Sequence, residues 1–147
     1  MAAITLTQAT AIVTAALQRA RETGCAPLTV AVLDAGGHLK AFAREDGSGI
    51  LRPQIAVGKA WGALGMGVGT RALAKRLADN PQQHPFFTAL AGMSEGRVVP
   101  VPGGVLIRDA AGAVIGGVGI SGDVSDKDEA CAQAEVASIK DDLTSSR

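Results

Sequence analysis

The chain has 147 residues, of which 47% are hydrophobic and 19% charged, as in a globular domain rather than a disordered segment. Fourteen basic residues balance fourteen acidic ones, and aromatic residues make up only 3%, so neither a phosphate-binding surface nor a base-stacking platform is expected. Cys25 and Cys131 are too few for a disulfide scaffold and too far apart for a C-x-x-C metal site, so we expect two buried thiols.

The beginning of the chain has no basic start followed by an apolar block, which argues against a signal peptide. No apolar run reaches the roughly 18 residues of a membrane-spanning helix. We therefore expect one cytoplasmic domain over residues 1–147, with no metal site and with neither nucleic acid nor a membrane as a partner.

Local patterns predict a helix and a hairpin in the first third of the chain. Thr5 and Gln8 form a capping box, and apolar residues at helical spacing predict a helix over 6–23. Strands over 28–33 and 38–44 follow, joined by an Asp-Ala-Gly-Gly turn. Alternation along the second strand predicts two opposite faces, Leu39, Ala41 and Ala43 on one and Lys40, Phe42 and Arg44 on the other.

A second round of helices and strands follows. Helices are expected over 54–66, with a face nearly bare of side chains, and over 71–78, whereas 81–97 resembles a loop. A second hairpin over 105–120 precedes a last helix that begins at Ser125. Glycines in its second strand indicate that a backbone or a ligand approaches closely; they are Gly112, Gly116, Gly117 and Gly119. This order predicts an α+β domain with a mainly antiparallel sheet flanked by helices.

The strongest candidate for chemistry is a polar set around the end of the first hairpin and the helix after it. Its members are Arg44, Glu45, Asp46, Arg52 and Lys59. A strand end that meets a helix start can gather cations around a small anion. Ordinary ion pairing at the surface is the alternative explanation.

Three further residues are weaker candidates. His38 directly follows a Gly-Gly turn, where a structural or solvent-facing role is expected. His84 lies in a loop before a proline and could be an axial ligand or an acid–base group, or could simply face solvent. Ser121 lies in Gly-Ile-Ser-Gly-Asp, which lacks the G-x-S-x-G pattern of a nucleophilic serine. Its alternative role is to receive a carboxylate beside the start of the last helix.

Several segments together resemble the GlcG/HbpS-like family of haem-degrading or haem-binding domains, which also forms the C-terminal part of PduO-type corrinoid adenosyltransferases. They are VAVLDAGGHLKAFAREDG, IAVGKA, PGGVLI, and GAVIGGVGISG followed by DEACAQA. The resemblance covers residues 7–140 and implies a profilin-like, five-stranded antiparallel sheet flanked by helices. It also implies homo-oligomers, from dimers to octamers, and haem as a candidate ligand. Trp61 departs from the family, which has small or polar residues there.

The family pattern falls on a defined set of residues. They are Asp34, Gly36, Gly37, Arg44, Asp46, Lys59, Gly103, Gly104, Gly119, Ser121, Gly122, Asp128 and Cys131. Three hypotheses follow. The first is a homo-oligomer that binds haem or a small organic acid through Arg44, Lys59, Gly103, Gly104, Ser121 and His38. The second is an enzyme of a catabolic operon acting on a small carboxylic or aromatic acid, with Lys59, Asp46 and His84 as candidate catalytic residues. The third is a structural partner of an operon-encoded enzyme.

Overall fold

The computed structural model describes residues 3–145, with side chains described as far as residue 136. The elements in chain order are helix α1 (Leu6–Glu22), strands β1 (Thr29–Asp34) and β2 (Leu39–Arg44), helices α2 (Arg52–Met66) and α3 (Thr70–Asp79), the short 3-10 helix η1 (Pro81–Gln83), helix α4 (His84–Met93), strands β3 (Gly104–Arg108) and β4 (Val114–Ser121), and helix α5 (Ser125–Ser145). The predicted α+β class, the two hairpins and the capping box at Thr5 are confirmed.

The sheet of the described chain has four strands in the order β2-β1-β4-β3, and every neighbouring pair is antiparallel. The five-stranded sheet implied by the family resemblance is therefore wrong. The segment expected to be a loop, residues 81–97, contains η1 and the ten-residue helix α4. That segment adds no strand, because its backbone hydrogen bonds are made within helical turns.

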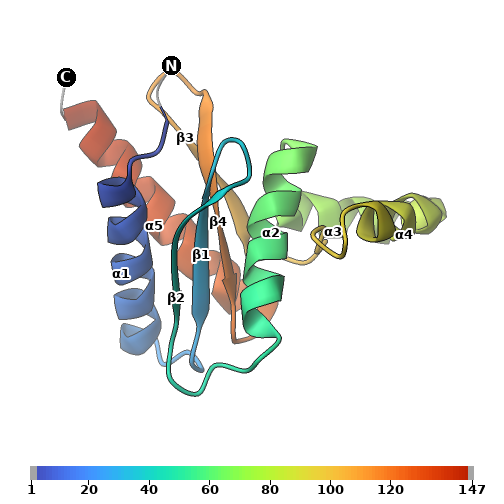
Figure 1. Ribbon diagram of the computed structural model, residues 1–147, viewed down its shortest axis with the longest axis horizontal. Helices are drawn as coiled ribbons and strands as arrows, with labels where there is room; N and C mark the ends of the chain where they lie inside the picture. Colours follow the sequence, from blue (N-terminus) through green and yellow to red (C-terminus); the bar gives the residue numbers. More distant parts are fainter. Residues whose placement is uncertain (1–2, 146–147) are drawn as a thin grey trace.

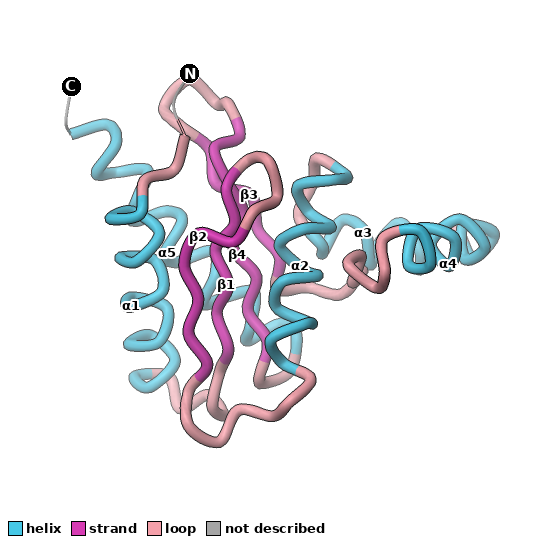
Figure 2. The backbone as a smooth tube through the Cα atoms, viewed as in Figure 1, coloured by secondary structure: helices cyan, strands magenta, loops and turns pink. Residues whose placement is uncertain are grey.

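The sheet has helices on both faces. Helices α1 and α5 cover one face and α2 covers the other, with α3 and α4 extending beyond α2 (Figure 1). The main core lies under α1 and α5, where Ile12, Val30 and Val118 are buried. A second, smaller core around Leu73 and Phe87 joins α3 and α4 to α2. Figure 2 shows α4 well away from the strands, whereas Thr70 at the start of α3 contacts Gly104 of β3.

The glycines of β4 explain how closely α2 lies on the sheet. A Cβ atom at Gly119 would collide with the carbonyl oxygen of Ala56 and lie 2.9 Å from the backbone nitrogen of Ala60. At Gly117 it would lie 3.4 Å from the carbonyl oxygen of Ala60. The predicted close approach is confirmed at Gly117 and Gly119, where the approaching group is a helix backbone rather than a ligand. It is wrong for Gly112, which lies in the turn before β4 and has no atom within 4 Å.

Strand β2 contains an irregularity that the alternation in the sequence does not reveal. Val32 pairs with Ala41, but the next residue, Leu33, pairs with Leu39, so the register shifts and Lys40 has no partner. An extra residue of this kind turns the following side chains to the other face of the strand. Leu39 consequently joins Phe42 on the α2 side, and the predicted grouping of Leu39 with Ala41 is wrong.

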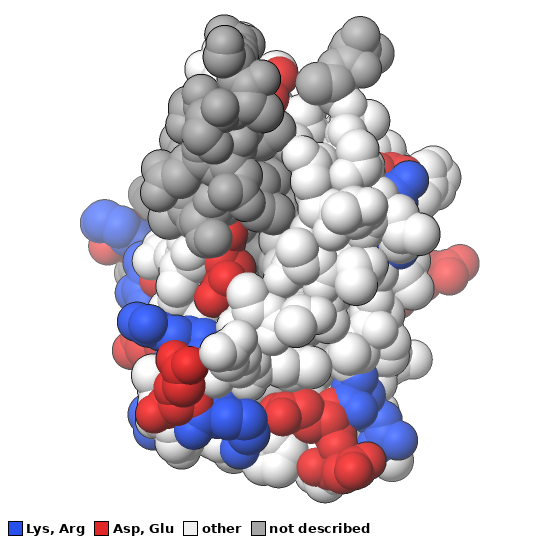
Figure 3. Space-filling view, turned by 90° about the vertical axis from the view of Figure 1, so that its left-hand side faces the viewer, with Lys and Arg blue, Asp and Glu red and all other residues white. Residues whose placement is uncertain are grey.

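The described surface shows charges of both signs side by side. On the face that carries α1, basic and acidic side chains lie next to one another along the lower part (Figure 3). One such pair joins Arg21 to Glu45 at 3.1 Å. Within the described residues, no helix combines the length and the hydropathy needed to cross a bilayer.

Candidate functional site

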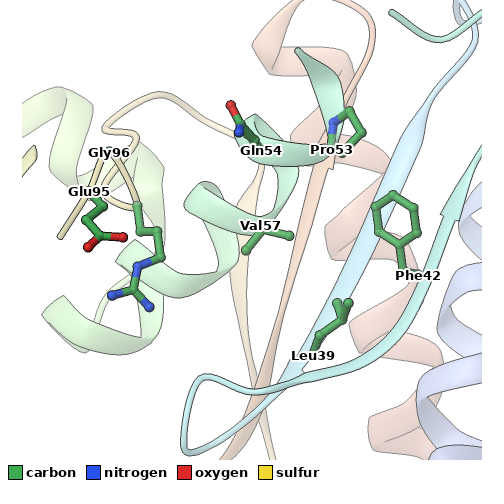
Figure 4. A pocket seen from close by; sticks show the side chains of 8 residues that line it. Leu39, Phe42, Pro53, Gln54, Val57, Glu95 and Gly96 are labelled. Atoms are coloured by element: carbon green, nitrogen blue, oxygen red, sulfur yellow. The ribbon is translucent and has the colours of Figure 1, made fainter. Parts of the chain in front are cut away.

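A groove of about 520 Å³ separates β2 from the first turns of α2. Its lining residues are Leu39, Phe42, Pro53, Gln54, Val57, Glu95, Gly96 and Arg97. In Figure 4, Val57 of α2 points toward Phe42 and Leu39 of β2, and the segment after α4 closes one end. The volume lies within the range of small-molecule sites, roughly 300–1,000 Å³.

Local structure places the apolar side of the groove. The register shift in β2 directs Leu39 and Phe42 toward α2, where they remain 57% and 40% exposed. Pro53 occupies the first turn of α2, where its missing N–H costs no hydrogen bond, and Val57 follows one turn later. Apolar side chains with this much exposure are available to an apolar ligand.

The polar end of the groove comes from the segment that ends α4. Glu95 has a φ of 57°, the left-handed conformation that non-glycine residues adopt at a cost of about 1 kcal/mol. Arg97 follows, and its Nε donates to the carbonyl oxygen of Ser94 at 2.9 Å. Its guanidinium group lies 4.4 Å from the centroid of the Trp61 ring. The two contacts hold a cation in a fixed orientation at the rim of the groove.

Lys59, a candidate for both binding and catalysis, lies elsewhere. Its side chain is 2% exposed, and its Nζ donates to the carbonyl oxygen of Ile120 at 2.9 Å and to Asp128 Oδ2 at 3.2 Å. Asp128 is 1% exposed and also accepts the backbone N–H of Asp123 at 3.0 Å. Burial lowers the pKa of Lys59 and raises the pKa of Asp128, because both charges lose their hydration. The pair forms a buried ionic link between α2 and α5.

Three more predicted ligand-binding residues surround this link. Gly103 has a φ of 129°, and a Cβ atom there would lie 2.7 Å from Lys59 Nζ. The backbone N–H of Gly104 donates to Thr70 Oγ1 at 2.9 Å, and the buried Ser121 hydroxyl accepts from Arg52 Nη1 at 3.1 Å. The structure brings Lys59, Gly103, Gly104 and Ser121 together in a packed junction, and none of them lines the groove. A ligand role for these four stays a prediction.

The remaining candidates are scattered. Arg44 Nη1 donates to the carbonyl oxygen of Ser48 at 2.8 Å, and Arg44 lines a separate hollow with Asp46. Asp46 is exposed in the loop after β2, whereas His84 is exposed at the start of α4. With Lys59 buried under the Pro-Gly-Gly loop, the three proposed catalytic residues lie in different parts of the fold. His38 is exposed at the start of the hairpin's second strand, directly before Leu39.

Sequence reasoning missed most of the groove. The signal for Leu39 was hidden by the register shift, and Arg97 lay in the segment that resembled a loop. Trp61 was the one visible sign, because an aromatic residue stood where small residues are usual. The structure gives it a partner, Arg97.

Comparisons with known proteins agree on one family. The family model described as "Haem degrading protein HbpS-like" matches residues 4–137. The corrinoid adenosyltransferase PduO of Salmonella typhimurium (strain LT2) is 33% identical over 126 residues, which are 85% of this chain but only 35% of PduO. The chain therefore spans about a third of that relative.

Two crystal structures are similar to this chain in fold. A complex of PduOC with haem has 28% identity and a TM-score of 0.80, over 92% of this chain and 94% of PduOC. HbpS has 31% identity and a TM-score of 0.79, over 95% of this chain and 92% of HbpS.

Proposed function

Because this chain belongs to the HbpS-like family of haem-degrading proteins, we propose that it binds haem, or a tetrapyrrole like it, in the groove between β2 and α2. The observation that carries the proposal is an apolar groove with one oriented cation at its rim. Phe42 and Val57 provide apolar contact surface, and Arg97 provides a guanidinium group. A small organic acid would use Arg97 but leave most of the apolar lining unused.

The chemistry of the lining residues fits such a ligand. A tetrapyrrole is a flat apolar ring with carboxylate groups at one edge. Burial of apolar area contributes roughly 25 cal/mol per Å², and a guanidinium group forms strong charge-assisted hydrogen bonds with a carboxylate. Arg97 is held by Trp61 and by Ser94 before any ligand arrives, which reduces the entropy lost on binding.

His38 is the histidine that we propose for iron coordination. It directly precedes Leu39, a groove residue, but its ring lies beside Gly36 at the turn, so coordination requires the side chain to turn toward the groove; His84 lies on α4. Haem supplies the iron when bound, and a neutral imidazole nitrogen is a common ligand for it. The expected result for His38→Ala is a changed Soret band at saturation, while His84→Ala keeps the wild-type spectrum.

We also propose that the chain self-associates. Ile50 and Leu51 lie in the turn before α2 and are 89% and 65% exposed, and β2 beside them is an edge strand. Exposed apolar side chains next to an open strand edge commonly mark an interface. Ile50→Lys should reduce the mass measured by light scattering, and Val124→Lys, a change at another exposed apolar residue, should not.

Haem titration followed by absorbance tests the proposed site. Val57→Trp adds an indole to the groove wall and should weaken haem binding at least about tenfold, or about 1.4 kcal/mol. Val124→Trp makes the same change at a residue that is 61% exposed and lies outside the groove, and it should bind as the wild type does. Equal affinities for the two variants would contradict the proposed site, and no Soret shift in the wild type would contradict haem binding.

A further inference from the structure

The two cysteines, 106 positions apart in the sequence, meet in the fold. Both are buried in the main core, with Cys25 6% and Cys131 2% exposed. They line a cavity of about 150 Å³ together with Arg19, Thr23 and Lys127. The cavity has no part in the proposed ligand groove.

Backbone contacts hold the Cys25 side of the pair. The backbone N–H of Cys25 donates to the carbonyl oxygen of Ala20 at 3.0 Å, and Arg21 Nη2 donates to the carbonyl oxygen of Cys25 at 2.8 Å. Cys131 lies on α5, one turn after Asp128, whose contact with Lys59 anchors the start of that helix. Each thiol is thus carried by a backbone that is itself fixed.

We propose that Cys25 and Cys131 form a reversible intramolecular disulfide on exposure to a small peroxide. The bond would link the segment between α1 and β1 to α5. Hydrogen peroxide suits a cavity of about 150 Å³, because one water molecule occupies about 30 Å³ in the liquid, whereas a disulfide donor of glutathione size does not fit. The inference is independent of ligand binding in the groove.

The reaction balances with hydrogen peroxide as the oxidant. The Cys25 thiolate attacks one peroxide oxygen, the O–O bond breaks, and a sulfenic acid and one water form. The Cys131 sulfur then attacks the sulfenic sulfur, the S–S bond forms, and a second water leaves. Two electrons pass from the two thiols to the peroxide, and both thiol protons end in water.

The surroundings decide the order of attack. Burial raises the pKa of Cys131 to about 11, so this thiol is protonated at neutral pH and reacts slowly as the first nucleophile. Cys25 is the more exposed of the two, and the Thr23 hydroxyl lies 3.5 Å from its sulfur. Arg19 and Lys127 are the basic residues that line the cavity beside the two cysteines. We therefore assign the first step to Cys25 and the resolving step to Cys131.

The test uses the whole, reduced chain. It is treated with one equivalent of hydrogen peroxide and then unfolded in the presence of iodoacetamide, which alkylates free thiols. Its intact mass is measured by mass spectrometry. The expected product is a monomer that has lost two hydrogen atoms and takes up no iodoacetamide, and dithiothreitol restores both alkylation sites. A non-reducing tryptic map should contain the Cys25 peptide joined to the Cys131 peptide. The melting temperature should rise by roughly 10 °C, because the bond closes a long loop.

Two controls separate a prearranged pair from general thiol oxidation. In Cys131→Ala the resolving thiol is missing, so Cys25 should stop at the sulfenic acid and react with dimedone. The wild-type chain oxidised in urea should form the disulfide at least about tenfold more slowly, since unfolding removes the proximity of the thiols. Two alkylatable thiols after peroxide treatment, oxygen addition to each sulfur separately, or intermolecular dimers would each overturn the proposal. The measurements on the wild-type chain test the proposal even if Cys131→Ala fails to fold.

Discussion

Replacing Lys59 by Met separates a structural role of this residue from a role in ligand binding. Lys59 and Asp128 are 2% and 1% exposed, and their charged atoms lie 3.2 Å apart. The substitution leaves the Asp128 carboxylate buried without its partner, which typically costs about 3–5 kcal/mol. The free energy of unfolding of a domain is only about 5–15 kcal/mol in total, so we expect a large fall in the urea midpoint measured by circular dichroism.

A second variant and a control make the test specific. Lys59→Met combined with Asp128→Asn removes both charges while the amide oxygen can still accept the backbone N–H of Asp123. The double variant should be more stable than Lys59→Met alone, by on the order of 2 kcal/mol. Lys75→Met changes a lysine that is 74% exposed and should alter the stability by less than about 0.5 kcal/mol. Unchanged stability of Lys59→Met together with loss of haem binding would refute the structural role and identify Lys59 as a ligand contact.

Two further substitutions test the packing of β4 and the start of α5. Gly119→Ala should lower the free energy of unfolding by about 2–3 kcal/mol, because its methyl group collides with the carbonyl oxygen of Ala56. Gly92→Ala, near the end of α4, meets no atom within 4 Å and should be neutral or slightly stabilising. Equal urea midpoints for the two variants would refute this packing. Asp123 accepts the backbone N–H of Ala26 at 2.8 Å, and such bonds lower its pKa from the ordinary 3.8. Its stabilising contribution is therefore present above pH 3.8 and lost as the pH falls through the lowered pKa, so Asp123→Ala should be less stable than the wild type at neutral pH and should converge with it in acid. A constant difference between their pH–stability curves would contradict this link.

The parts of the fold that the sequence predicts well rest on local signals. The capping box at Thr5 and Gln8 and the Asp-Ala-Gly-Gly turn fix their elements through contacts between near neighbours in the chain. Helix α4 could not be predicted in this way, because Gln83 at its start makes no side-chain cap. Its stability comes from packing of Phe87 against the second core, which only the folded chain assembles.

The candidate site was harder to predict for the same reason. Lys59 lies beside other polar residues in the sequence, but its partner Asp128 is 69 residues away. The register shift at Lys40 leaves no trace in the alternation of apolar residues, yet it decides which face Leu39 occupies. Arg97 acquires its position through Trp61 and Ser94 after the fold has formed.

The most direct test of the central claim is the position of the ligand on the protein. Titration of the isotopically labelled chain with diamagnetic zinc protoporphyrin, followed through backbone amide NMR shifts, locates the ring without paramagnetic broadening. The account predicts the largest shifts at Leu39, Phe42, Val57 and Arg97, which line the groove. Shifts concentrated around Gly104, or no saturable shifts at all, would contradict it.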